Sequence, residues 1–146
     1  MARQDTRLES EGAEFLVLGT MLCEGIPAYK MYVNMPGYDL IAVNPEGDRV
    51  ARVSVKMRWK ADAKGFIIRN FDSDFVVVVK LNKGGREPSL PEMYVIPTAV
   101  VEAAPRDGQW GKVRFSSIPD LASYRDAWHL VRERIALPTV AVPAEE

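Results

Sequence analysis

The 146-residue sequence has very few of the side chains that most often build disulfides, zinc sites or catalytic triads. It contains one cysteine, Cys23, which excludes an intramolecular disulfide and a cysteine-rich metal site. Its single histidine, His129, argues against Ser-His-Asp, Cys-His and histidine-rich zinc arrangements. Carboxylates, lysines and hydroxyls therefore remain as the candidates for chemistry.

Net charge and long apolar runs are also missing. The formal net charge is −1, so bulk electrostatics does not indicate a nucleic-acid partner, and any attraction to phosphate must come from a local patch. No apolar run approaches the roughly twenty residues of a membrane-spanning helix, and no signal peptide is recognisable. We expect a cytoplasmic protein with no membrane partner, and the length suits one domain over residues 1–146.

Apolar spacing predicts helices at both ends of the chain and strands between them. The first helix is expected over residues 7–24, with Leu8, Phe15, Leu18 and Leu22 on its apolar side. The segments that favour strands are 28–35, 38–44, 49–59, 65–70, 75–81 and 92–97, of which 75–81 has the composition of a strand buried on both faces. A short helix from Thr98, a long helix over 120–135 capped by Asp120, and a flexible tail over 137–146 complete the prediction. This order is typical of an α/β or α+β sandwich.

The two strands on either side of a turn at Glu46 and Gly47 hold the most informative polar residues. Pairing about this turn predicts that Asp39 lies opposite Ser54, and strand alternation places Lys56 on the same face as Ser54. Glu14 would reach that side if the first helix packs over it. One interpretation is a half-solvated sheet whose charges face water. The other is that a carboxylate, a hydroxyl and an ammonium group converge to do chemistry.

The motif Pro-Gly-Tyr-Asp39-Leu-Ile, followed by Val-Ser54-Val-Lys56, resembles the small members of the PD-(D/E)xK nuclease superfamily, and Glu14 on the preceding helix extends the resemblance. The resemblance implies a restriction-endonuclease-like fold with a mixed central β-sheet flanked by helices. It implies an endonuclease that uses Mg²⁺ or Mn²⁺ to hydrolyse DNA. Asp39 and Glu14 would be the metal ligands, and Lys56 would orient or activate water and stabilise charge on the phosphate.

One position departs from the family pattern and leaves a second function open. Ser54 stands where the family has Glu or Gln, and a neutral hydroxyl is a weaker metal ligand than a carboxylate. The alternative is therefore a catalytically degenerate nuclease-fold protein that serves as a nucleic-acid-binding or assembly module. A third interpretation is a purely structural domain, for which a homodimer formed through an exposed strand is one form.

Basic and aromatic residues suggest where DNA would bind. The candidate contacts are Lys30, Arg52, Arg58 and Lys60, with Trp59 and Trp110 available to stack on bases. The alternative is that these charges only keep the surface soluble and that the tryptophans pack into the core.

Overall fold

The computed structural model describes residues 6–32, 37–84 and 87–138. The predicted turn at Pro36 and residues 139–146 of the predicted tail lie outside these ranges. The elements in chain order are α1 (Thr6–Cys23), β1 (Ala28–Lys30), β2 (Leu40–Val43), β3 (Val50–Arg58), β4 (Gly65–Ile67), β5 (Phe75–Lys80), β6 (Glu92–Pro97), α2 (Thr98–Ala103), β7 (Arg106–Asp107), β8 (Lys112–Arg114), the 3₁₀ turns η1 (Phe115–Ser117) and η2 (Leu121–Tyr124), and α3 (Trp128–Arg134). None of the described helices is long and apolar enough to cross a membrane.

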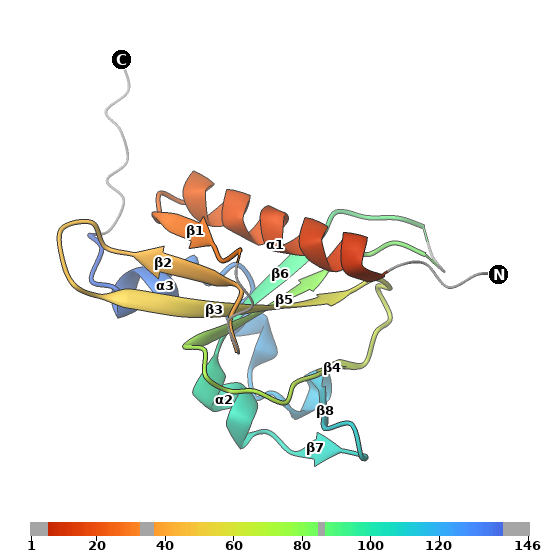
Figure 1. The fold of residues 1–146 in the computed structure, drawn as a ribbon. Coiled ribbons are helices and arrows are strands. Elements are labelled where there is room, and N and C mark those ends of the chain that lie inside the picture. Colours follow the sequence, from red (N-terminus) through yellow and green to blue (C-terminus); the bar gives the residue numbers. More distant parts are fainter. Residues whose placement is uncertain (1–5, 33–36, 85–86, 139–146) are drawn as a thin grey trace.

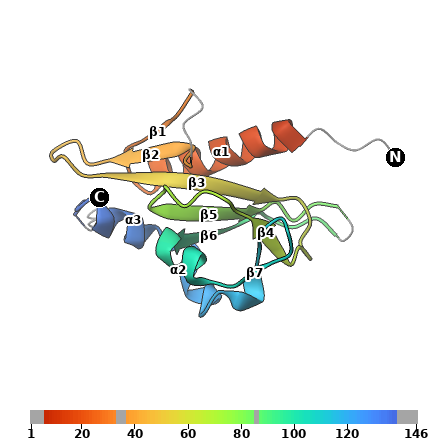
Figure 2. The same cartoon turned by 60° about the horizontal axis from the view of Figure 1, so that its bottom comes forward.

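A five-stranded sheet in the order β1-β2-β3-β5-β6 forms the centre of the molecule. Strands β3 and β5 run parallel, whereas the other neighbours are antiparallel. One core lies between this sheet and helices α1 and α3, and a second core lies between its other face and α2 with the small sheet (Figures 1 and 2). The predicted α/β fold with a mixed central sheet flanked by helices is confirmed.

The hairpin register agrees with the prediction from its turn. Leu40 pairs with Val53 and Val43 with Val50, so partners follow the register that places Asp39 opposite Ser54. Strand β5 is buried on both faces, as its run of valines predicted. Its valines alternate between the two cores, because successive strand residues point to opposite faces.

The predicted apolar side of α1 is wrong. The helix buries Ala13, Val17 and Met21, whereas Leu8 and Phe15 are exposed. These three buried residues recur every four positions and form one stripe along the helix. The small side chains of Ala13 and Val17 let the helix lie close to the sheet, and of the four predicted residues Leu18 packs, partly buried, against this core.

The predicted helix over residues 120–135 is also wrong, because it is interrupted. Asp120 and Asp126 have positive φ angles of 54° and 50°, a left-handed conformation that an α-helix cannot contain. The segment therefore forms η2 and, separately, α3. Trp128 of α3 packs in the core beneath α1, whereas Leu121 of η2 packs against the opposite core.

A second, three-stranded sheet in the order β4-β8-β7 lies at the C-terminal end of β5 and was not predicted as a sheet. Phe66 of β4 and Val113 of β8 point into the second core. The sheet register places Asp107, Lys112 and Ile67 in one row, on its outward face.

Candidate active site

Asp39 directly precedes β2, at the point where the pairing of β2 with β3 ends. Its backbone N–H donates to Val53 O at 2.9 Å, and its carbonyl accepts from Met31 N at 2.9 Å. Its side-chain Oδ2 accepts from the backbone N–H of Val55 at 2.8 Å. The Asp39 carboxylate therefore fills the opening between β2 and β3 in place of the next ladder bond.

Gly37 helps to fix this position. It has a φ angle of +90°, and a Cβ atom at Gly37 would come within 2.5 Å of Asn70 Oδ1 and 2.8 Å of Asp72 Cβ. Only glycine fits this conformation and this close approach. The segment leading into Asp39 is thus packed against the loop that precedes β5.

Glu14 of α1 comes close to Asp39 from the helical side of the sheet. Its Oε1 accepts from Lys30 Nζ at 2.9 Å, and the same ammonium lies 3.1 Å from Glu11 Oε1. Burial raises the pKa of Glu14, the hydrogen bond from Lys30 acts in the opposite direction, and the nearby charge of Asp39 raises it further. The net pKa is above the ordinary value of 4.5, as expected where two carboxylates share a partly buried region.

Lys56 and Ser54 lie on the opposite face from α1. The register with β5 pairs Ser54 with Val76 and Lys56 with Val78, and both valines belong to the second core. Helix α1 instead packs on the face of Val53. The condition for Glu14 to share a face with Lys56 is therefore not met. Asp39 is tied to this part of β3 through Val55, the residue before Lys56.

Lys56 and Ser54 differ in what they can offer a ligand. Lys56 has no ion-pair or hydrogen-bond partner within the described part of the chain. Ser54 is only 5% exposed and contributes a neutral hydroxyl from inside the sheet. Lys56 is therefore available to an anionic ligand, whereas Ser54 adds no charge.

The four predicted nucleic-acid contacts do not form one surface. The side chain of Lys30 is 5% exposed, so its charge is committed to Glu11 and Glu14 inside the protein. Arg52 stacks over Tyr38 at 5.7 Å. Arg58 buries its Nε without a hydrogen-bond partner among the described residues, and Lys60 is exposed on the loop after β3.

Two carboxylates, rather than three, are available here to bind a metal ion. In residues 6–32, 37–84 and 87–138 no group of three or more His, Cys, Asp or Glu side chains is arranged to hold a metal. Asp74, an acid further along the chain, accepts from Arg52 N and pairs with Arg134, so it is used elsewhere. Mg²⁺ is commonly held by one or two carboxylates with water and substrate phosphate as the other ligands, so the Glu14 and Asp39 pair fits that metal.

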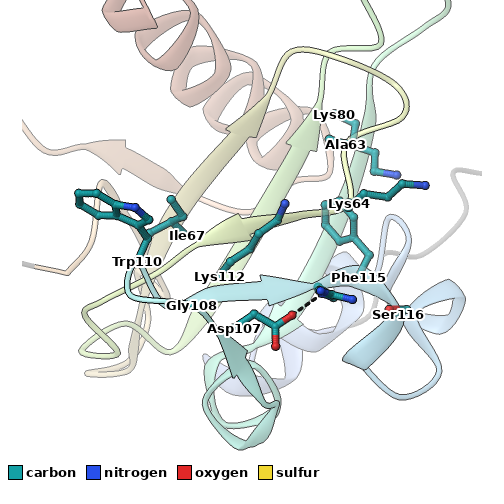
Figure 3. A pocket seen from close by; sticks show the side chains of 11 residues that line it. Ala63, Lys64, Ile67, Lys80, Asp107, Gly108, Trp110, Lys112, Phe115 and Ser116 are labelled. Atoms are coloured by element: carbon teal, nitrogen blue, oxygen red, sulfur yellow. Dashed lines mark ion pairs between the residues drawn. The ribbon is translucent and has the colours of Figure 1, made fainter.

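The structure also contains a basic cavity that was not recognised in the sequence. We call it the outer groove; it lies on the outward face of the small sheet (Figure 3) and has a volume of about 730 Å³. It is lined by Ala63, Lys64, Ile67, Lys80, Asp107, Gly108, Trp110, Lys112, Arg114, Phe115 and Ser116. The available signal was the dipeptide Asp107-Gly108 before the alternating Lys-Val-Arg of β8, a pattern typical of a hairpin.

No protein-family model and no curated protein matches this sequence. Among solved structures, the chain is similar to "a bacterial homing endonuclease: I-Ssp6803I", with a TM-score of 0.66 and 24% sequence identity over 90% of this chain and 96% of that chain. The fold is shared with a nuclease. At this identity the similarity establishes the architecture, and the chemistry has to be argued from the residues of this chain.

Proposed function

We propose that the protein is a Mg²⁺- or Mn²⁺-dependent endonuclease that hydrolyses phosphodiester bonds of DNA at a PD-(D/E)xK-like site. The observation that carries the proposal is the Asp39 carboxylate, held by Val55 N–H at the opening between β2 and β3, with Lys56 free on β3. The charge of Asp39 also raises the pKa of Glu14, which makes Glu14 the second candidate ligand. The similarity in fold to a homing endonuclease supports it.

The hydrogen bonds at this edge leave one oxygen of each carboxylate available. Val55 N–H occupies Oδ2 of Asp39, and Lys30 occupies Oε1 of Glu14. The other oxygens, Asp39 Oδ1 and Glu14 Oε2, have no hydrogen-bond partner among the described residues. They are the atoms that would hold the metal, which when bound polarises the phosphate and lowers the pKa of a coordinated water.

The protein groups supply orientation and charge. The hydrogen bond from Val55 holds the Asp39 carboxylate in one orientation, so little reorganisation is needed when substrate arrives. Lys56 provides a point charge for a phosphate oxygen and an ammonium near the attacking water. Lys30 balances Glu14 and limits the repulsion between the two acids.

A direct test is cleavage of supercoiled plasmid and of duplex oligonucleotides in Mg²⁺, in Mn²⁺ and in EDTA. We expect metal-dependent nicking that falls at least about a thousandfold in Asp39→Asn, a loss equivalent to about 4 kcal/mol of transition-state stabilisation. The matched control is Asp62→Asn, which removes the same charge from an exposed loop position and should keep its rate. Cleavage that is unchanged in Asp39→Asn would show that this site is not responsible.

The second candidate is a nuclease-fold module that binds nucleic acid or assembles with a partner but no longer cleaves. The buried neutral Ser54, in place of the family's Glu or Gln, favours it. DNA binding by the wild-type chain without nicking in either metal would support the module over the enzyme.

A further inference from the structure

The outer groove concentrates positive charge in a chain whose net charge is −1. Four basic side chains line it: Lys64, Lys80, Lys112 and Arg114. Its single acid, Asp107, is paired with Arg114 across the small sheet. The three lysines therefore have no carboxylate against them within the groove, which makes it complementary to a polyanion.

The groove is also apolar and aromatic beneath this charge. Ile67 on β4 and Phe115 after β8 line it, and the Lys80 ammonium lies 4.6 Å from the centre of the Phe115 ring. Trp110, at the tip of the β7–β8 hairpin, is 57% exposed, with the Arg69 guanidinium 5.2 Å from the centre of its ring. Figure 3 shows Trp110 at one end of the groove and the ammonium groups of Lys64 and Lys80 toward the other.

The groove combines cations with apolar and aromatic surface. The cations suit the phosphate of a nucleotide, and the apolar and aromatic surface suits its base. A base has a flat face that stacks on an aromatic ring or lies against aliphatic side chains, and its phosphate is attracted to lysine. The bases of a duplex are stacked on one another and cannot enter such a cavity. A volume of about 730 Å³ is in the range of sites that enclose a small organic molecule.

We propose that the outer groove binds an unpaired segment of a nucleic-acid strand, with a base against Trp110 and Ile67 and phosphates on Lys64 and Lys112. The inference rests on the proposed association with DNA but not on cleavage. The groove is close to the candidate active site. Lys80, which lines the groove, lies beside Arg58 in the ladder between β5 and β3. Arg58 is two residues beyond Lys56, about 7 Å further along β3. An unpaired segment held there would flank a phosphate at Lys56.

The test uses the full chain with a short single-stranded thymidine oligomer and a duplex of equal length, each followed by fluorescence anisotropy and by quenching of tryptophan fluorescence. We expect the single strand to bind more tightly than the duplex and to quench the exposed Trp110. Lys64→Glu should weaken binding of the single strand at least about tenfold. Its matched control is Arg49→Glu, an exposed residue at the opposite end of β3, which should change the affinity less than about threefold although the net charge changes equally.

The stacking role of Trp110 is tested separately. Trp110→Ala should lose the quenching and weaken single-strand binding about tenfold, whereas Tyr29→Ala, an aromatic residue of similar exposure on β1, should have little effect. Preference for the duplex, or equal losses in the groove variants and their controls, would overturn the proposal. Quenching of Trp110 by inorganic phosphate alone, to the same extent as by the oligomer, would also overturn it, because phosphate has no base to stack on the ring.

The outcomes also separate this inference from the proposed function. Asp39→Asn should retain single-strand binding, because Asp39 is not in the groove. Single-strand binding without metal-dependent cleavage would contradict only the endonuclease proposal. Cleavage without preferential binding and quenching by the single strand would contradict only the groove proposal.

Discussion

The two sides of the central sheet use charge in opposite ways. Under α1, the buried Lys30 pairs with Glu14 and Glu11, and burial and the charge of Asp39 both raise the pKa of Glu14. Across the sheet, the outer groove gathers lysines against a single acid that is already paired. A net charge of −1 is therefore compatible with two local groupings of charge, a candidate cation site and a candidate polyanion site.

After the loss in Asp39→Asn, the largest decrease in cleavage is expected at Lys56 of β3. Lys56→Met should reduce metal-dependent DNA cleavage about 10²- to 10³-fold, because a charge that stabilises the developing anion is lost. Mn²⁺ binding, measured by calorimetry, should be almost unchanged, because the proposed metal ligands are the two carboxylates. A parallel loss of metal affinity and cleavage would mean that Lys56 supports the site structurally instead.

Much of the hairpin could be predicted from the sequence, because its pairing is local. A tight turn at Gly47 sets the register of two antiparallel strands, and strand alternation then divides the polar from the apolar positions. The valine-rich β5 was recognisable for a similar reason, since a strand covered on both faces has no polar alternation.

The parts that could not be predicted depend on tertiary contacts. The sequence of α1 has leucines on two sides, and only packing against the sheet selects the side of Ala13 and Val17. The left-handed conformations of Asp120 and Asp126 interrupt a pattern that otherwise favours one helix. The outer groove is formed by the end of β5 together with the small sheet. Two of its lysines, Lys80 and Lys112, are more than thirty positions apart in the chain, so spacing alone does not indicate the groove.

The second prediction compares a lysine inside the acidic region with one in the groove. Lys30→Met should lower the free energy of unfolding by about 2 kcal/mol near neutral pH, because it leaves Glu14 partly buried beside Asp39 without its charged hydrogen bond. Lys64→Met, at an exposed position, should change it by less than about 0.5 kcal/mol. Urea denaturation of both variants measures the difference.

The pH dependence of the Lys30→Met loss follows from the pKa of Glu14. That pKa is raised in the folded protein, so the folded state binds more protons than the unfolded state, and the charged carboxylate costs stability as pH rises above its ordinary value of 4.5. Without Lys30 this cost increases. The loss should therefore be complete above the pKa of Glu14 in the variant, which is higher than in the wild type, and should disappear as the pH falls through these two raised pKa values. A loss independent of pH would indicate a packing effect.

A smaller effect is expected from one charge in the outer groove. Lys112→Gln should weaken single-strand binding about threefold to tenfold, and the slope of log affinity against log salt should become shallower by about 0.7. Titrations over a range of salt concentrations measure this slope. An unchanged slope would place Lys112 outside the phosphate contacts.

The smallest effect is expected at Ser54. Ser54→Ala should slow cleavage less than about tenfold, because a neutral hydroxyl contributes at most one hydrogen bond or one weak metal contact. Single-turnover cleavage at saturating Mn²⁺ measures it. A loss as large as that of Lys56→Met would instead make the hydroxyl an essential part of the site.

The proposed activity depends on Glu14 and Asp39 holding the catalytic metal together. The most direct measurement is the nicking rate as a function of Mn²⁺ concentration for the wild-type chain and for Glu14→Gln, with melting curves to verify folding. We expect the wild type to nick DNA and Glu14→Gln to need at least about ten times more Mn²⁺ for half of its maximal rate, since one of two charged ligands is lost. No nicking by the wild type at any Mn²⁺ concentration, or the same Mn²⁺ dependence in both proteins, would contradict it.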